Sequence, residues 1–72
     1  MALDALLPLI EEIRREGALV LLKWDGERTE SVTTVLITRK DTNYVFHKDS
    51  NDAASALHEA ILDYRKDHPR PA

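Results

Sequence analysis

The side chains able to do chemistry in this 72-residue chain are three histidines, thirteen carboxylates and a few serines. His47, His58 and His68 show no ligand spacing such as HxxxH, so no metal site is predicted. The carboxylates of the expected helices form no acid–base pair and are interpreted as solvated charges: Glu11, Glu12, Asp63 and Asp67. The chain is therefore predicted to have no catalytic residue and no metal ligand.

Nucleophilic and phosphate-binding motifs also do not occur. Ser31, Ser50 and Ser55 stand in no nucleophile-elbow context. The only two glycines, Gly17 and Gly26, are too far apart to form a phosphate-binding loop. Cysteine is absent, which excludes disulfides and thiolate metal sites. The prediction is a non-enzymatic protein without a cofactor.

The composition is typical of a soluble protein rather than a polyanion-binding or membrane protein. The net charge is −3, and acidic and basic residues are mixed along the chain. The first apolar run stops at Glu11 and Glu12, and no apolar run approaches the roughly 20 residues needed to span a bilayer. A cytoplasmic protein without membrane contact is the expectation.

The elements that must position any functional residue centre on residues 18–48. Three runs rich in β-branched and aromatic residues predict an antiparallel meander: Ala18–Trp24, Val32–Arg39 and Tyr44–Lys48. Asp25–Gly26 is a strong hairpin signal. A two-residue turn there, however, would not place the apolar residues Val35 and Ile37 opposite the apolar residues of the first strand. A longer connection, from Asp25 to about Ser31, is preferred, because it brings Val20 and Leu22 opposite Ile37 and Val35.

A helix is expected on each side of the meander. The first has an apolar stripe, Asp4 as its N-cap and Gly17 as the left-handed residue that ends it. Pro8 then falls near its first turn, or is its first residue if the helix starts later. Asp49 or Ser50 is expected to cap the second helix. The apolar stripe of the first helix is Leu3, Leu6, Leu7, Ile10 and Ile13. The apolar stripe of the second helix is Ala53, Leu57, Ala60, Ile61 and Tyr64.

The predicted fold is a single α+β domain over residues 1–67, followed by a flexible tail over residues 68–72. Its order is α-β-β-β-α, with both helices packed on one face of the sheet as a two-layer sandwich. Trp24 is expected between the sheet and the helices, alongside Val20 and Leu22.

The sheet carries more apolar residues than one covered face requires. Strand alternation places four aliphatic residues on the side opposite the predicted core: Leu19, Leu21, Leu36 and Val45. They would expose on the order of 300–400 Å², close to the size that marks a contact site. These residues are therefore the predicted protein interface, for a second copy or another protein. The alternatives are that the helices divide between the two faces, or that these residues simply face solvent.

The element order and length are similar to those of the double-stranded-RNA-binding domain family. That resemblance implies a basic cluster at the start of the last helix, where phosphates would be held. Here the corresponding residues, 49–54, read Asp-Ser-Asn-Asp-Ala-Ala, which would repel phosphate. A nucleic-acid-binding module is kept as the alternative function, with the dispersed cations Lys23, Arg39, Lys40 and Lys48 as its contacts.

Overall fold

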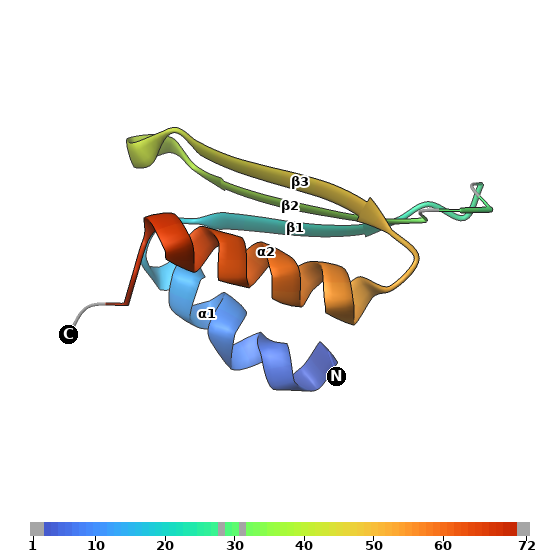
Figure 1. Cartoon of the computed structure of the whole chain (residues 1–72), viewed down its shortest axis with the longest axis horizontal. Coiled ribbons are helices and arrows are strands. Elements are labelled where there is room, and N and C mark those ends of the chain that lie inside the picture. Colours follow the sequence, from blue (N-terminus) through green and yellow to red (C-terminus); the bar gives the residue numbers. More distant parts are fainter. Residues whose placement is uncertain (1–2, 28, 31, 71–72) are drawn as a thin grey trace.

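The computed structural model describes residues 3–27, 29–30 and 32–70. It has the α+β order predicted, with one helix, three strands and a second helix. Figure 1 shows that α1 and α2 lie on the same side of the sheet, and that no other described element covers the opposite side. The expectation that the two helices share one face is confirmed.

The first helix begins later than predicted. Residues Leu3–Leu6 form a 3₁₀ turn, and α1 spans Leu7–Arg15 with Pro8 in its first turn. Asp4 lies within the 3₁₀ turn, so its assignment as the N-cap is wrong. Pro8 favours this start, because proline is tolerated in the first helical turn and pre-sets the helical φ.

Gly17 ends α1 as predicted. Its φ is +108°, a conformation that side chains with a Cβ rarely adopt. The Gly17 N–H donates to the Arg14 carbonyl at 3.0 Å, and the Ala18 N–H donates to the Ile13 carbonyl at 3.2 Å. These two bonds form a Schellman motif, which turns the chain directly into the first strand.

The sheet is an antiparallel meander with the order β1-β2-β3, spanning Leu19–Trp24, Thr33–Arg39 and Tyr44–Ser50. Val20 lies opposite Ile37, and Leu22 lies opposite Val35. The preferred long connection and its register are therefore correct. The Asp25 N–H closes the connection by donating to the Val32 carbonyl at 2.7 Å. Ser31, where the predicted connection ends, lies outside the described residues.

The second helix is capped by a different residue from the two predicted. α2 spans Ala53–Asp67, and the carboxylate of Asp52 accepts a hydrogen bond from the Ser55 N–H at 3.1 Å. Asp49 and Ser50 instead continue β3, which is two residues longer than predicted. β3 pairs with β2 along its whole length, so the ladder extends to Ser50 before the chain turns.

The core lies between the helices and the sheet, and is built from parts of both predicted helical stripes and the alternating positions of β2. Leu7 was assigned to the first stripe but is 53% exposed. Its buried apolar members are Leu6, Ile13, Ala18, Val35, Ile37, Tyr44, Ala56, Leu57, Ala60, Ile61 and Tyr64. Val20, Leu22 and Phe46 are only partly buried against this cluster. The apolar cover is therefore thinner over the edge strands than over β2.

Trp24 is not a core residue. It is the last residue of β1 and shares the helix side with Val20 and Leu22, yet its side chain is 58% exposed. Its partner on β2, Thr33, is only 1% exposed. The helices therefore cover the central strand at this level but leave the end of the edge strand open to solvent.

Candidate functional site

The side of the sheet away from the helices is called the open face here. The register sets its side chains in three rows across the strands: Leu19–Thr38–Val45, then Leu21–Leu36–His47, then Lys23–Thr34–Asp49. The first two rows hold every aliphatic residue of this face, and the third row holds its ionic residues. The face therefore has an apolar end and a polar end.

All four predicted interface residues lie together in the first two rows. Leu19 is 56% exposed, Leu21 is 47% exposed and Val45 is 68% exposed, whereas Leu36 on the central strand is half-buried. Together they expose about 300 Å² of apolar side chain, which is at the lower end of the range for functional patches.

The polar end of the open face is internally bonded. The Thr34 hydroxyl donates a hydrogen bond to Asp49 Oδ1 at 2.6 Å, and His47 Nε2 lies 3.7 Å from the same oxygen. The Thr34 bond ties β2 to β3, and the His47 contact lies within β3. Protein–protein interfaces likewise combine an apolar region with polar groups at its border.

A hollow adjoins the apolar end of the open face. Its volume is about 390 Å³, and its lining is Gly17, Leu19, Thr38, Lys40 and Asp41. Leu19 and Thr38 belong to the first row, so the hollow extends the apolar end of the face towards the β2–β3 turn. A concave feature beside an apolar patch can receive a side chain of a docked protein.

The helix side of the molecule carries a groove of about 420 Å³ lined by Leu9, His58, Ile61, Leu62, Arg65, Pro69 and Arg70. It is mainly apolar, but its two arginines are already in ion pairs. Arg65 and Arg70 both lie within 3.1 Å of Glu12 Oε1. The groove therefore offers no uncommitted arginine to select a ligand.

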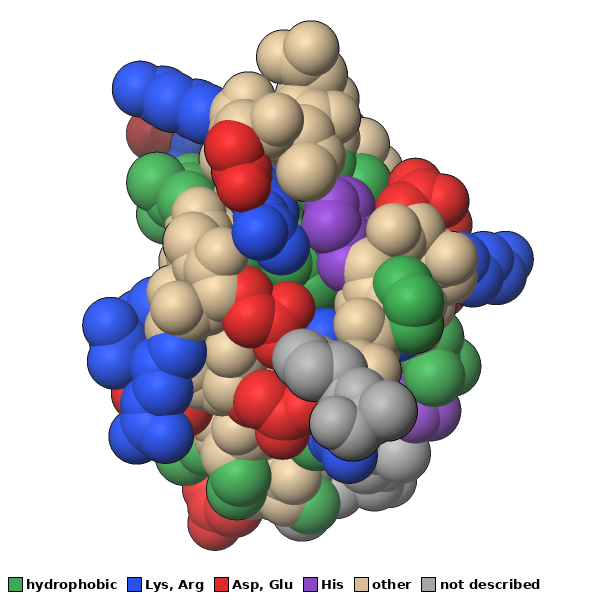
Figure 2. Space-filling model, turned by 90° about the vertical axis from the view of Figure 1, so that its left-hand side faces the viewer, with side chains coloured by type: hydrophobic (Ala, Val, Ile, Leu, Met, Phe, Trp, Pro, Cys, Tyr) green, Lys and Arg blue, Asp and Glu red, His purple; other side chains and the backbone are tan. Residues whose placement is uncertain are grey.

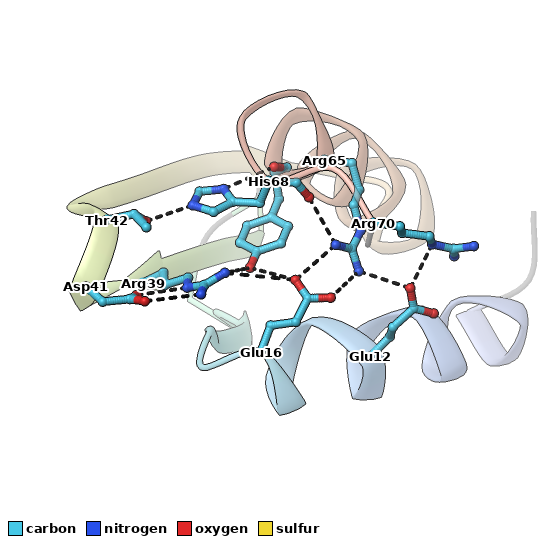
Figure 3. A network of polar contacts seen from close by, with 9 residues as sticks. Glu12, Glu16, Arg39, Asp41, Thr42, Arg65, His68 and Arg70 are labelled. Atoms are coloured by element: carbon cyan, nitrogen blue, oxygen red, sulfur yellow. Dashed lines mark hydrogen bonds and ion pairs between the residues drawn. The ribbon is translucent and has the colours of Figure 1, made fainter. Parts of the chain in front are cut away.

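A polar network joins the end of α1 to β2 and to the end of α2 (Figure 3). Arg65 donates two hydrogen bonds to the Glu16 carboxylate, from Nη1 to Oε1 at 3.0 Å and from Nη2 to Oε2 at 2.8 Å. Arg39 Nη1 lies 3.9 Å from Glu16 Oε1 and donates a hydrogen bond to the Tyr64 hydroxyl at 3.0 Å. In Figure 2, acidic and basic side chains gather around a histidine at this end of the molecule.

Tyr64 and His68 anchor the network to the core. The two rings stack with centroids 4.4 Å apart, and His68 Nε2 is hydrogen-bonded to the Thr42 hydroxyl at 2.7 Å. His68 and Arg70, which belong to the predicted tail over residues 68–72, both contact the domain. Residues 71–72 lie outside the described part of the chain, and the flexibility of the tail stays a prediction. The network holds the end of α2 in place, which is a structural role.

Glu16 should make the stability of the fold depend on pH. The bidentate Arg65 guanidinium lowers the Glu16 pKa, and burial opposes this shift more weakly. A carboxyl group whose pKa is lower in the folded than in the unfolded protein stabilises the fold at pH values above its unfolded-state pKa, which is about 4.3 for Glu. This stabilisation is lost as the pH falls through the pKa of the group in the folded protein. Glu16→Gln should therefore lower the free energy of unfolding by about 1–2 kcal/mol at pH 7. The difference should shrink as the pH falls below about 4.3, as measured by urea denaturation.

Glu11→Gln is the matched control. Glu11 pairs with Arg14 at 2.8 Å, and Arg14 also lowers its pKa, but both side chains are more than half exposed. Solvent screens such a pair, so the urea midpoint should hardly change. An equal effect of the two substitutions at pH 7 would contradict the role given to Glu16.

The histidines and carboxylates remain dispersed. His47 lies on the open face, His58 on α2 and His68 in the polar network. Within the described residues, no three His, Asp or Glu side chains gather as metal ligands do. Asp63 accepts a hydrogen bond from the Tyr44 hydroxyl at 2.5 Å. Burial and this carboxylate raise the Tyr44 pKa, so the phenol stays protonated and cannot act as a base at neutral pH.

The four cations of the nucleic-acid alternative do not share one surface. Lys23 is on the open face, and Lys40 is in the turn after β2. Arg39 lies in the polar network and contacts Asp41 at 2.8 Å, while Lys48 is paired with Glu59. Two of the four are therefore neutralised by carboxylates, which weakens the case for a phosphate-binding track.

None of the helices in the described parts of the chain is long and apolar enough to cross a membrane. Comparison with protein-family models, curated proteins and solved structures found no match to this chain.

Proposed function

We propose that this chain is a small non-enzymatic interaction module whose open face docks onto the open face of a second copy. The observation that carries the proposal is the exposed cluster of Leu19, Leu21, Leu36 and Val45. A sheet that packs one face on helices normally alternates towards polar residues on its other face. This sheet keeps aliphatic residues at four of its nine open-face positions, which supports a face that becomes covered.

The size of the domain supports a second copy as the occupant. A chain of about 60–70 residues buries only about 60% of its unfolded surface, so its own core provides little stability. Without cysteines, disulfides cannot supplement that core. Oligomerisation is one of the few remaining sources of stability for a chain of this size.

The rows of the open face also suit a symmetric contact. Two such faces packed about 10 Å apart, related by a two-fold axis that runs between the first and second rows, would set the aliphatic rows against one another. The rows containing Lys23 and Asp49 would then lie at the two margins, where both charges remain in water. No aliphatic residue of the face would be left facing solvent alone.

The expected dimer is weak. Each copy contributes about 300 Å² of apolar patch, so the total of about 600 Å² falls below the roughly 1,200 Å² of a standard stable interface. Association should therefore vary with concentration in the micromolar range, which suits a reversible regulatory contact. We place this contact in the cytoplasm, which the cysteine-free composition supports.

Light scattering coupled to size-exclusion chromatography tests the proposal. We expect the measured mass to rise from one chain, 8.2 kDa, towards two chains as the loaded concentration increases across the micromolar range. Salt should change the dissociation constant little, because apolar burial dominates the contact. A mass that stays at one chain up to millimolar concentration would refute self-association and leave a different protein as the partner.

A further inference from the structure

The edge strand β1 has backbone hydrogen-bonding groups that pair with no other strand in the described part of the chain. The Asp25 N–H bond to the Val32 carbonyl identifies these two residues as a hydrogen-bonded pair of the antiparallel ladder. Such pairs alternate along a ladder, so Lys23, Leu21 and Leu19 also point their backbone groups at β2. The N–H and C=O groups of the residues between them, Val20, Leu22 and Trp24, point away from the sheet.

β1 lacks the features that usually protect an edge strand. Within the described chain its only strand neighbour is β2. It contains no proline, it has no bulge in its pairing with β2, and Lys23 is its one charged residue. β3, the opposite edge, carries the consecutive polar residues His47, Lys48 and Asp49. An unprotected edge is a template for one more strand.

Trp24 is the second observation at this edge. It is the only tryptophan of the chain, and it is 58% exposed beside the outward backbone groups. It lies on the helix side of the sheet, so a partner bound to the open face would not cover it. Tryptophan is enriched among residues that dominate the energy of protein interfaces.

From these features we propose that β1 pairs antiparallel with β1 of a second copy, about a two-fold axis at Leu22. In this register Leu22 lies opposite its own counterpart, and Trp24 lies opposite Val20 of the other copy. All the outward groups of Val20, Leu22 and Trp24 then find partners. The product is a continuous six-stranded sheet with every helix on one side.

The structure selects this register over its neighbours. An axis at Leu21 or Val20 would require Ala18 to join the new ladder, but the Ala18 N–H already donates to Ile13 at 3.2 Å. An axis at Lys23 would set the two Lys23 side chains directly opposite, which destabilises a pair of strands. With the axis at Leu22, each Lys23 lies opposite Leu21 of the other copy, and its alkyl stem can cover that leucine.

Charge does not prevent this pairing. The two Lys23 residues become diagonal neighbours, with Cβ atoms about 7 Å apart. At 0.15 M salt the screening length is about 8 Å, so much of their repulsion is removed. The pairing uses a different surface from the open face, and either contact can exist without the other.

Amide hydrogen exchange, measured by NMR on the full chain at low and high concentration, tests the edge. We expect the Val20, Leu22 and Trp24 amides to exchange at least about tenfold more slowly at the concentration where the mass has doubled. The amides of β3 provide the internal control and should keep their rates. The fluorescence emission of Trp24 should shift to shorter wavelength over the same concentration range.

Two variants separate the edge from the open face. Val45→Lys changes the open face on β3 and leaves β1 intact, so the concentration-dependent protection of Val20 and Leu22 should persist. Trp24→Ser should weaken edge pairing at least about tenfold while the thermal unfolding midpoint changes little. The proposal is overturned if the mass doubles while these amides keep their exchange rates, which would assign the dimer to the open face. It is also overturned if the mass never doubles, which would leave only an extended strand of another protein for this edge.

Discussion

Tyr64→Ala should remove a large part of the free energy of unfolding at 25 °C. Tyr64 is fully buried, its ring lies edge-on to Tyr44 with centroids 5.3 Å apart, and its hydroxyl takes part in the polar network. Truncating a buried aromatic ring to alanine costs about 3–5 kcal/mol. A 72-residue domain has about 4–11 kcal/mol of total stability, so this single change removes a large part of it. Circular dichroism during urea denaturation measures the loss.

Two further substitutions show where the effect of Tyr64 originates. Tyr64→Phe keeps the ring and removes the hydroxyl, which accepts a hydrogen bond from Arg39 at 3.0 Å; the expected cost is about 1–2 kcal/mol. Trp24→Ala removes an even larger ring from an exposed position, so it should cost less than about 1 kcal/mol in the monomer. A larger loss for Trp24→Ala than for Tyr64→Ala would contradict the position of the core.

The sheet was predictable because its residues leave little freedom of register. A shift by one residue would have moved Val35 and Ile37 off the face shared with Val20 and Leu22. Density of β-branched residues identified β2 as the central strand, and the structure confirms this position. The burial of Leu57 and Tyr64 followed in the same way from helical spacing.

The extent to which each side chain on the helix side of the sheet is buried was not predictable from strand alternation. Alternation assigns Trp24 to a side of the sheet, but says nothing about how far the helices reach along that side. The cap of α2 was missed for a related reason, since Asp49, Ser50 and Asp52 are all good capping residues. Only the length of the β2–β3 ladder, which extends to Ser50, leaves Asp52 as the cap.

The polar network was missed because its members are far apart in the sequence. Glu16, Arg39 and Arg65 come from three different elements, and each alone is compatible with a solvated charge. In contrast, the open-face residues follow from strand parity, which is a local property. The position of Leu19, Leu21, Leu36 and Val45 on one face could therefore be predicted, whereas what covers them stays a proposal.

Leu21→Lys should abolish self-association without unfolding the monomer. Leu21 is 47% exposed and lies opposite Leu36 on the open face, and both helices are on the other side of the sheet (Figure 1). A lysine there can extend into water in the monomer, so helical circular dichroism and the thermal midpoint should be preserved. In the proposed dimer the ammonium group would be buried in the aliphatic rows, at a cost of several kcal/mol. About 3 kcal/mol already raises the dissociation constant more than a hundredfold.

Leu62→Lys is the matched control for this substitution. Leu62 is 54% exposed on α2, away from the open face, so the same chemical change at a similar exposure should alter neither mass nor stability. Leu21→Lys would also set a lysine opposite Lys23 of the other copy in the β1 pairing, so it weakens both proposed contacts. Val45→Lys affects only the open face, because Val45 lies on β3.

The masses of the three variants, measured over one concentration series, therefore separate the possible contacts. If Leu21→Lys and Val45→Lys both stay monomeric while Leu62→Lys dimerises, the open face is the contact between copies. If only Leu21→Lys stays monomeric, the contact between copies lies at the β1 edge. The partner of the open face would then be a different protein. If Leu62→Lys alone loses association, the second copy binds the helix side, and both proposals are wrong.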